Sequence, residues 1–267
     1  MKTYFFIMSF LVIFNLNACK SDLNEQTNTQ SMQKDYITSQ QVQIQNEYPK
    51  ETKTKEKQTI IKSLKEEIQN VTDLIEQDKN NIQENEPADQ FGMKNGAFKI
   101  IIGNPSQKAY NDPKSQGNRR QFYSSLDYNE NKISQLGIIL NKITSDDIHR
   151  GQLHIDITNA GRAYSQFLFE RAVDKLKEYQ DKLDLLNFQD LITIKVKFDT
   201  IKQLRLLWQN TVDNIIKDYE DNKMGIQTDS QKLIEHIREQ YGNILKNKIP
   251  TIGIIIGDIN KILKTLN

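Results

Sequence analysis

The 267-residue sequence predicts an all-α protein, a bundle of about five to seven helices behind a disordered N-terminal tether. The composition favours helices, because Lys, Glu, Gln, Leu and Ile are abundant while only 11 glycines and 5 prolines interrupt the chain. Apolar residues recur at alternating spacings of three and four, which is typical of helices with one buried face. Residues 20–57 are too polar to bury the surface that would offset the entropy of ordering, so we expect them to form the tether.

The N-terminus has the features of a bacterial lipoprotein signal peptide over residues 1–18. Lys2 precedes an apolar run, Tyr4–Phe14, of about a dozen residues, which is shorter than the ~20 residues that a spanning helix needs. Cys19 is the only cysteine and directly follows a small residue. We therefore expect Cys19 to be the lipid attachment site and residues 19–57 to be a lipid-anchored flexible tether. An ordinary secretory signal and a short membrane anchor are the alternatives.

Composition limits the partners that the chain can have. Lys and Arg total 36 against 35 Asp and Glu, and one of the lysines lies in the signal peptide, so the mature chain is balanced in charge. We therefore predict no nucleic-acid partner. The lysines between residues 50 and 65 alternate with glutamates, which favours a solvated helix face over a polyanion site. With the only thiol attached to lipid, no disulfide can form, and the domain at residues 58–267 has to be stable through its core alone.

The first predicted helix spans Gln58–Glu84. Its apolar residues form one stripe, with polar residues on the other faces: Ile61, Leu64, Ile68, Val71, Ile75 and Ile82. The stripe covers only about three heptads, so packing within the chain is favoured over a free coiled coil. Pro87 ends the helix.

An irregular connection is predicted over residues 88–118, where most of the turn-forming residues of the chain are concentrated. The run Phe98–Ile102 is apolar enough for a strand, but no neighbouring segment offers a partner, and a lone strand is unstable. We expect this connection to be largely irregular and to pack over the helices through the side chains of that run.

Helices then occupy most of the chain. Phe122 and its neighbours form one apolar turn, and Asp127–Glu130 has the spacing of a capping box that restarts a helix. Ser145–Asp147 is predicted to cap the next helix, which Gly151 and Gly161 weaken by roughly 1 kcal/mol each without ending it.

The last two predicted helices lie beyond a break at residues 184–187. The first of them carries Trp208 on its apolar stripe, which favours a core anchor over an interface hot spot. Residues 228–231 have the composition of an N-terminal cap for the second.

No catalytic, metal or cofactor site is predicted. The histidines are His149, His154 and His236; no two of them are four residues apart, and no cysteine remains to complete a zinc site. Asp146 and Asp147 are neighbouring carboxylates, but capping and the helix dipole explain them at a helix start. The chain has no P-loop, dinucleotide fingerprint, nucleophile elbow or EF-hand loop. We therefore expect a protein that is not an enzyme.

The C-terminal run Pro250–Ile259 is the most unusual part of the domain. It contains Gly253 and Gly257 in a small-xxx-small spacing but is too short to span a bilayer. One interpretation is a terminal helix that packs on the bundle. The alternative is an exposed partner surface, because so apolar a run has to be covered by something. The candidate residues for that surface are Ile252, Ile255, Ile256 and Ile259.

A resemblance to a known family is carried by residues 119–140. The string Arg-Arg-Gln-Phe-Tyr-Ser-Ser-Leu-Asp-Tyr at 119–128, followed by Lys132-Ile133, Leu136 and Ile139-Leu140, resembles the hallmark of one surface lipoprotein family of Lyme-disease spirochaetes. That family is typified by complement regulator-acquiring surface protein 1 and includes the P35-type antigens. The similarity extends over about residues 58–248.

The resemblance implies an all-α bundle displayed outside the cell and anchored by lipid in the outer membrane. It also implies a host protein as partner, either complement factor H or terminal complement components, and hence a role in complement evasion. An adhesin for a tick or mammalian receptor, or an antigenic surface protein without factor H binding, are the alternatives. No ligand-contacting residue can be matched position by position.

The resemblance further implies a homodimer, which the typical member forms through a long C-terminal helix. In this chain Pro250 lacks an amide hydrogen and clashes with the preceding turn, and Gly253 and Gly257 follow it within seven residues. A long uninterrupted terminal helix is therefore not expected, which argues against the homodimer without excluding it.

Overall fold

The structure is a computed structural model that describes residues 50–103 and 108–266. The signal peptide, the lipid attachment residue Cys19 and the tether up to residue 49 lie outside the described residues. The chain divides into two units, Met1–Thr52 and Lys53–Asn267. The second unit contains almost all of the described residues and, taken by itself, is a helical domain.

The described residues confirm the all-α prediction. The α-helices are α2 (Lys50–Glu84), α3 (Ala97–Ile100), α4 (Gln116–Ser124), α5 (Glu130–Thr144), α6 (Leu153–Thr158), α7 (Phe169–Glu178), α8 (Phe188–Glu220), α9 (Ser230–Asn243) and α10 (Ile252–Leu263). Short 3-10 segments cover Pro113–Ser115, Gln180–Leu185, Lys223–Gly225, Ile249–Thr251 and Lys264–Leu266, and π-helical segments cover Asn159–Leu168 and Ile244–Lys248. Because α6 continues into α7 and α9 into α10, the described part forms six rods besides the short α3, within the predicted range.

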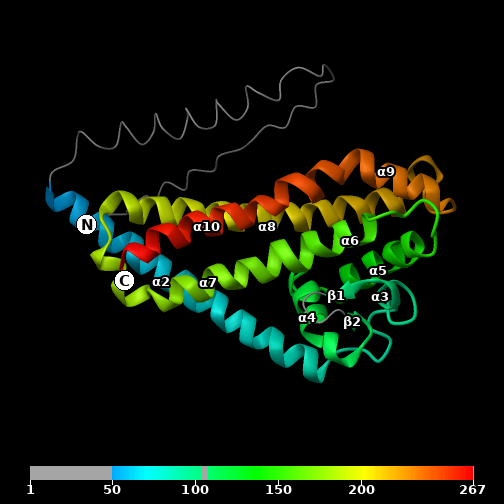
Figure 1. The fold of residues 1–267 in the computed structure, drawn as a ribbon, viewed down its shortest axis with the longest axis horizontal. Coiled ribbons are helices and arrows are strands. Elements are labelled where there is room, and N and C mark those ends of the chain that lie inside the picture. The colour runs from blue at the N-terminus through cyan, green and yellow to red at the C-terminus, as the bar shows by residue number, and fades with distance from the viewer. Residues whose placement is uncertain (1–49, 104–107, 267) are drawn as a thin grey trace, which may run out of the picture. The chain divides into compact units, whose positions relative to one another are not determined.

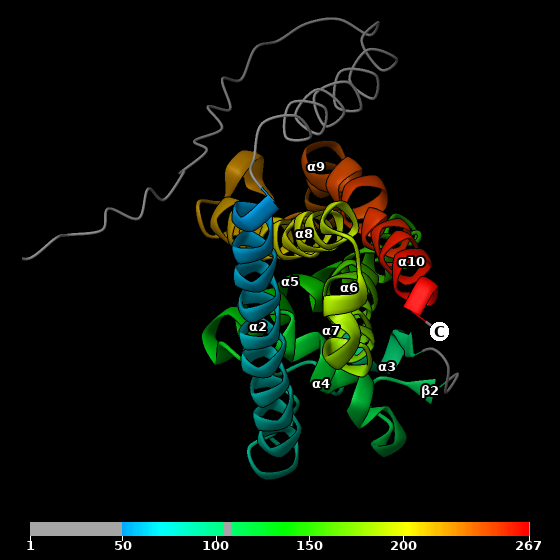
Figure 2. The same ribbon diagram turned by 90° about the vertical axis from the view of Figure 1, so that its left-hand side faces the viewer.

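Helix α2 begins at Lys50, inside the predicted tether, so the predicted boundary at residue 58 lies too late in the chain. The first residues of α2 have no apolar stripe that could reveal them, but Lys and Glu favour helix. Lys57 also donates from Nζ to the backbone oxygen of Asp184 at 2.6 Å. The predicted stripe is confirmed, because Leu64 and Ile68 are buried. Helix α2 runs across the other helices rather than along them (Figures 1 and 2).

The connection at residues 88–118 is more regular than predicted. Its apolar run begins as helix α3 and ends in a strand, β1 (Ile102–Gly103), which pairs antiparallel with β2 (Lys108–Ala109). The sequence did not reveal this partner because two-residue strands have no alternating pattern. Phe98 and Ile101 are buried, so the predicted packing of this run over the helices is confirmed.

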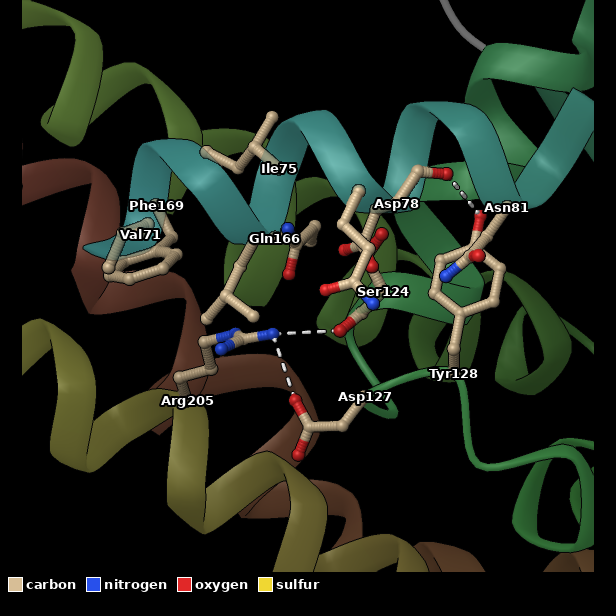
Figure 3. A pocket seen from close by; sticks show the side chains of 12 residues that line it. Val71, Ile75, Asp78, Asn81, Ser124, Asp127, Tyr128, Gln166, Phe169 and Arg205 are labelled. Carbon is tan, nitrogen blue, oxygen red and sulfur yellow. Dashed lines mark hydrogen bonds and ion pairs between the residues drawn. The ribbon is translucent and has the colours of Figure 1, made fainter. Parts of the chain in front are cut away.

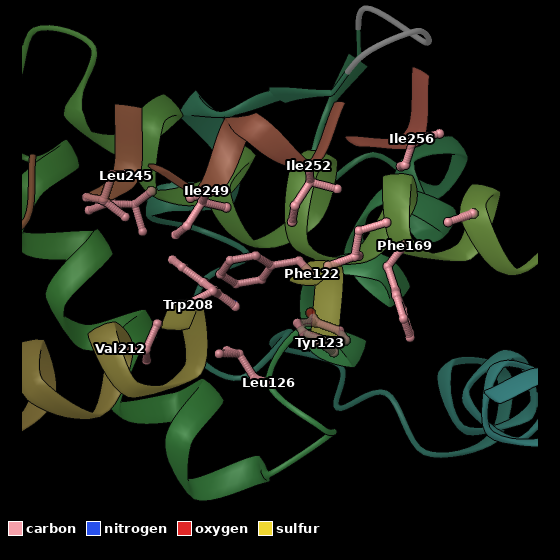
Figure 4. Packing of buried hydrophobic residues seen from close by; sticks show 14 of the residues in the cluster. Phe122, Tyr123, Leu126, Phe169, Trp208, Val212, Leu245, Ile249, Ile252 and Ile256 are labelled. Carbon is pink, nitrogen blue, oxygen red and sulfur yellow. The ribbon is translucent and has the colours of Figure 1, made fainter. Parts of the chain in front are cut away.

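The core is built around α8. Trp208 is fully buried, as predicted, and its indole N–H donates to Ser125 Oγ at 3.0 Å. Phe122 from α4 and Ile249 from the segment before α10 pack beside it (Figure 4). Gly161 allows this approach, because a Cβ atom there would lie 2.6 Å from Trp208 Cζ2. A glycine that sequence reasoning treats as a weak point of the helix is therefore a requirement of the core.

Helices α9 and α10 form a run that returns along α8 (Figure 1, orange to red). At Pro250 the run passes through a π-helical and a 3-10 segment before α10 begins, since proline supplies no amide hydrogen. The predicted interruption is therefore present, although the chain stays helical through it. Within the described residues, no helix combines enough length and apolarity to cross a bilayer.

The inner face of α10 packs against α7, α8 and residues 159–168. Ile252, Ile256 and Ile259 are buried in the core, and Ile255 is half-buried against it. The prediction that these four isoleucines form an exposed partner surface is wrong, because the domain itself covers them. Ile254 is the isoleucine of this run that faces outward, with 70% of its surface exposed.

The observed helix caps agree only in part with those predicted. Asp229 caps α9 as expected, and its side chain accepts from the amide of Lys232 at 3.0 Å. Helix α5 is capped by Asn129, which accepts from the amide of Lys132 at 3.0 Å. The capping box predicted at Asp127 is therefore wrong. Asp127 has a φ of +53°, in the left-handed region, and lies in the loop before the cap.

Candidate functional site

Residues 119–128, the signature segment, lie where α4 ends and form hydrogen bonds with α2, α8 and the run α6–α7. Most of the segment points inward: Arg119, Arg120 and all of Phe122–Leu126 are buried. Two buried arginines need partners, because an unpaired buried charge is strongly unfavourable.

Arg119 joins α4 to Glu86, which lies just beyond the end of α2, and to the connection. Its Nε and Nη2 donate to the two carboxylate oxygens of Glu86 at 2.6 and 2.9 Å. Its Nη1 donates to the backbone oxygens of Tyr110 and Asp112 at 2.6 and 2.9 Å. The hydroxyl of Tyr123 donates to Glu86 Oε1 at 3.0 Å, and burial together with that carboxylate raises the pKa of Tyr123. The Glu86 carboxylate therefore accepts hydrogen bonds from two residues of the signature segment, Arg119 and Tyr123.

Arg120 joins α4 to α7. Its Nη1 and Nη2 each donate to one carboxylate oxygen of Glu170, both at 2.8 Å. Burial alone would lower the pKa of Arg120, but the hydrogen bonds and charge of Glu170 raise it above its ordinary value. Gln166 completes this group, since its Nε2 donates to Glu170 Oε1 at 2.8 Å. The paired fork geometry holds both side chains in one orientation.

The second half of the signature segment joins α4 to α8. Ser125 Oγ accepts from Trp208 and donates to the backbone oxygen of Phe122 at 2.7 Å. Arg205 Nη2 donates to the backbone oxygen of Ser124 at 2.7 Å and to Asp127 Oδ1 at 3.3 Å. The segment is therefore a structural junction, and the residues that carry the family resemblance hold the fold together.

A cavity of about 270 Å³ lies beside this junction, under α2 (Figure 3). Its lining residues are Val71, Leu74, Ile75, Gln77, Asp78, Asn81, Ser124, Asp127, Tyr128, Gln166, Phe169 and Arg205. The hydroxyl of Tyr128 donates to the backbone oxygen of Asp78 at 3.1 Å and fixes one end of the cavity. Burial raises the pKa of the Asp78 carboxyl, and burial lowers the pKa of the Arg205 guanidinium.

Sequence reasoning missed this cavity. Its polar residues come from α2, α4, α8, the π-helical segment and the loop after α4, and no spacing along the chain connects Asp78, Gln166 and Arg205 with one another. Two signals were available in the sequence. The signature segment supplies Ser124, Asp127 and Tyr128, and Asp78 lies near the apolar face of its helix, three residues after Ile75.

The three histidines do not come together. His149 Nδ1 lies 2.9 Å from Asp146 Oδ1, and His236 Nε2 lies 2.8 Å from Asp218 Oδ2, at separate sites. Burial lowers the pKa of His154. In the described ranges, no group of three or more His, Cys, Asp or Glu side chains could hold a metal ion.

Comparisons with known proteins identify the family. Residues 80–264 match the family described as Borrelia Bbcrasp-1 domain containing protein. The chain is similar to Borrelia burgdorferi outer surface lipoprotein BBA64, with 28% identity and a TM-score of 0.70, over 78% of this chain and 98% of that one. Its orthologue BSA64 from Borrelia spielmanii is 28% identical with a TM-score of 0.70, over 79% of this chain and 99% of that one.

A third relative is the Lyme disease associated outer surface protein BBA65 from Borrelia burgdorferi. It is 26% identical with a TM-score of 0.69, over 76% of this chain and 99% of that one. No curated protein sequence matches the chain. The resemblance predicted from residues 119–140 is confirmed, and the chain belongs to the Borrelia Bbcrasp-1 domain family, whose structural relatives include outer surface lipoproteins of Lyme disease spirochaetes.

Proposed function

We propose that the chain is an outer-surface lipoprotein that binds a host protein, without catalysis, and thereby serves complement evasion. Membership in the Borrelia Bbcrasp-1 domain family carries the proposal, together with relatives named as outer surface lipoproteins. The proposed ligand is complement factor H or a terminal complement component. The proposed anchor is lipid on Cys19, and the proposed outward-facing location rests on the relatives named as outer surface lipoproteins rather than on the anchor.

A binding surface has to come from residues other than the signature segment and the inner face of α10, because the domain buries both. The loop between α5 and α6 and the loop between α8 and α9 offer such a surface. Ile148 and Met224 are 85% and 82% exposed. The loop of Ile148 and the start of α9 are joined by Ser230 Oγ, which donates to Asp146 Oδ2 at 2.8 Å. Apolar side chains this exposed are the kind that a protein partner covers.

Binding of residues 20–267 to immobilised factor H and to each terminal complement component tests the proposal. We expect saturable binding to one of them, weakened in the double variant Ile148→Ser, Met224→Ser. The control is Leu185→Ser, since Leu185 is also exposed, at 68%, but lies on another part of the domain. Absence of binding to every component would overturn the complement proposal. Attachment of intact cells to tick or mammalian tissue, lost on deletion of the gene, would then support the adhesin alternative.

Sidedness and anchoring have their own test. Brief proteolysis of intact spirochaetes is expected to remove the protein, and its survival would contradict an outward-facing location. In a detergent phase separation the wild-type protein is expected in the detergent phase and the Cys19→Ser variant in the aqueous phase. Partition of both into the same phase would contradict lipidation of Cys19.

A further inference from the structure

The cavity under α2 has one apolar part and one polar part. Val71, Ile75 and Phe169 form an apolar wall, and Leu74, which is 56% exposed, also lines the cavity. Asp78 and Gln166 supply oxygen atoms to the lining, from α2 and from the π-helical segment (Figure 3). A ligand for this cavity therefore has an apolar part and a group that donates hydrogen bonds.

The orientation of Gln166 is fixed by its neighbour. Its Nε2 donates to Glu170, which as a carboxylate can only accept, so the amide cannot be turned around without losing that bond. Gln166 is buried, and none of the described residues donates to its Oε1. The cavity is therefore bordered by a buried acceptor that has no donor.

The charge that remains in the cavity is that of Asp78. Arg205 also lines the cavity; its Nη2 donates to Asp127 and to the backbone oxygen of Ser124, while its Nε is buried without a partner among the described residues. Both terminal nitrogens of the nearby Arg120, Nη1 and Nη2, donate to the carboxylate of Glu170. No ion pair among the described residues includes the carboxylate of Asp78, which is half-buried. Because Arg205 is paired with Asp127 and Arg120 with Glu170, the charge left over beside the cavity is the negative charge of Asp78, which favours a cation.

The size and lining of the cavity restrict that cation. Its volume of about 270 Å³ lies just below the ~300–1,000 Å³ of pockets that hold drug-sized molecules. A bare Ca²⁺ needs about six to eight oxygen ligands, which a cavity with an apolar half does not offer. A primary ammonium on an alkyl chain carries three donors and an apolar stem, which matches both parts of the lining.

We infer that this cavity binds a primary alkylammonium group, with the nitrogen between Asp78 and Gln166 and the alkyl chain against Val71 and Ile75. The group can belong to a free aliphatic amine or to the lysine side chain of a partner. This inference is independent of the identity of the host ligand, because it rests on the cavity alone.

Calorimetric titration of residues 20–267 with pentylamine tests the inference, with 1-pentanol and pentanoate as controls of the same chain length. We expect saturable binding of pentylamine in the millimolar range and none of the two controls. Asp78→Asn is expected to weaken pentylamine binding by about tenfold or more, because a charge-assisted hydrogen bond is lost. Asp73→Asn is the matched control, since Asp73 is exposed on the same helix. Nα-acetyl-lysine amide and its norleucine analogue then distinguish a lysine side chain from a free amine as the source.

The comparison of ligands on the wild-type protein needs no variant, so it is informative even if Asp78→Asn folds poorly. Equal binding of pentylamine and pentanol, or no saturable binding of pentylamine, would overturn the inference. Equal loss of binding in Asp73→Asn and Asp78→Asn would also overturn it, because it would indicate attraction to the acidic surface rather than to the cavity.

Discussion

Arg120 and Glu170 show that this core contains charge. Their bidentate ion pair is buried between α4 and α7, and Gln166 donates a further hydrogen bond to Glu170. A buried pair adds little net stability compared with apolar residues of the same shape, but removal of one partner leaves an uncompensated charge. The pair therefore fixes how α4 meets α7 more than it adds to stability.

The Glu170→Ala substitution is expected to lower the free energy of unfolding by about 3–5 kcal/mol, because it leaves Arg120 buried without a carboxylate. Urea unfolding followed by circular dichroism measures the change. The control is Glu178→Ala, which breaks the exposed pair of Lys175 and Glu178 and is expected to change the free energy by less than about 1 kcal/mol. Replacing both partners, as Arg120→Met with Glu170→Leu, should restore much of the loss. Similar effects of the two single alanine substitutions would contradict this account.

Asp146 gives a residue-scale prediction about pH. The amide of His149 and the hydroxyl of Ser230 donate to this carboxylate and hold its pKa at about 2, below the ordinary 3.8. Because the pKa in the folded state lies below that in the unfolded state, the carboxylate stabilises the fold above pH 3.8 and loses this contribution as the pH falls toward 2.

The Asp146→Asn variant is therefore expected to melt at a lower temperature than wild type near neutral pH. The difference in Tm should shrink as the pH falls from about 5 toward about 2, where half of the wild-type carboxyl groups are protonated. Asp147→Asn is the control, since the side chain of Asp147 is 79% exposed, and it should show little difference at any pH. A difference in Tm for Asp146→Asn that does not vary with pH would show that charge is not its cause.

At the scale of elements, most of the helices could be predicted from the sequence, but the contacts between elements and several of their boundaries could not. The stripe of α2 and the burial of Trp208 follow from apolar spacing, because apolar residues three and four positions apart lie on the buried face of a helix. Three features have no apolar periodicity that could reveal them in the sequence. They are the turns of α2 before residue 58, the partner strand of β1 and the observed N-cap of α5. The cavity under α2 combines residues from several elements, so no local pattern could reveal it.

Two helical glycines with opposite surroundings provide an element-scale prediction. Gly161→Ala is expected to lower the free energy of unfolding by about 1–3 kcal/mol, because its Cβ would lie 2.6 Å from Trp208 and 2.9 Å from Ser125 Oγ. Gly257→Ala in α10 meets nothing within 4 Å and should raise the free energy by up to about 1 kcal/mol. Thermal unfolding of both variants measures the two signs, and a stabilising Gly161→Ala would contradict the packing described for Trp208.

At the scale of the whole molecule, the packing of the C-terminal helix determines which surface is available for a homodimer. Because α10 buries Ile252, Ile256 and Ile259 against its own chain, the inner face of this helix is not available to pair with a second copy. Residues 20–267 are therefore expected to show the mass of one chain in light scattering coupled to size-exclusion chromatography. A dimer mass at micromolar concentration would contradict this expectation and restore the homodimer that the family resemblance implies.

The inward orientation of the signature segment has a consequence for how this protein is detected. An antibody raised against a peptide of residues 119–128 should recognise the chain on a denaturing immunoblot and fail on the folded domain, because Arg119, Arg120 and Phe122–Leu126 are covered. Antibodies that bind the folded domain are expected to recognise outward loops such as that of Met224, which is 82% exposed.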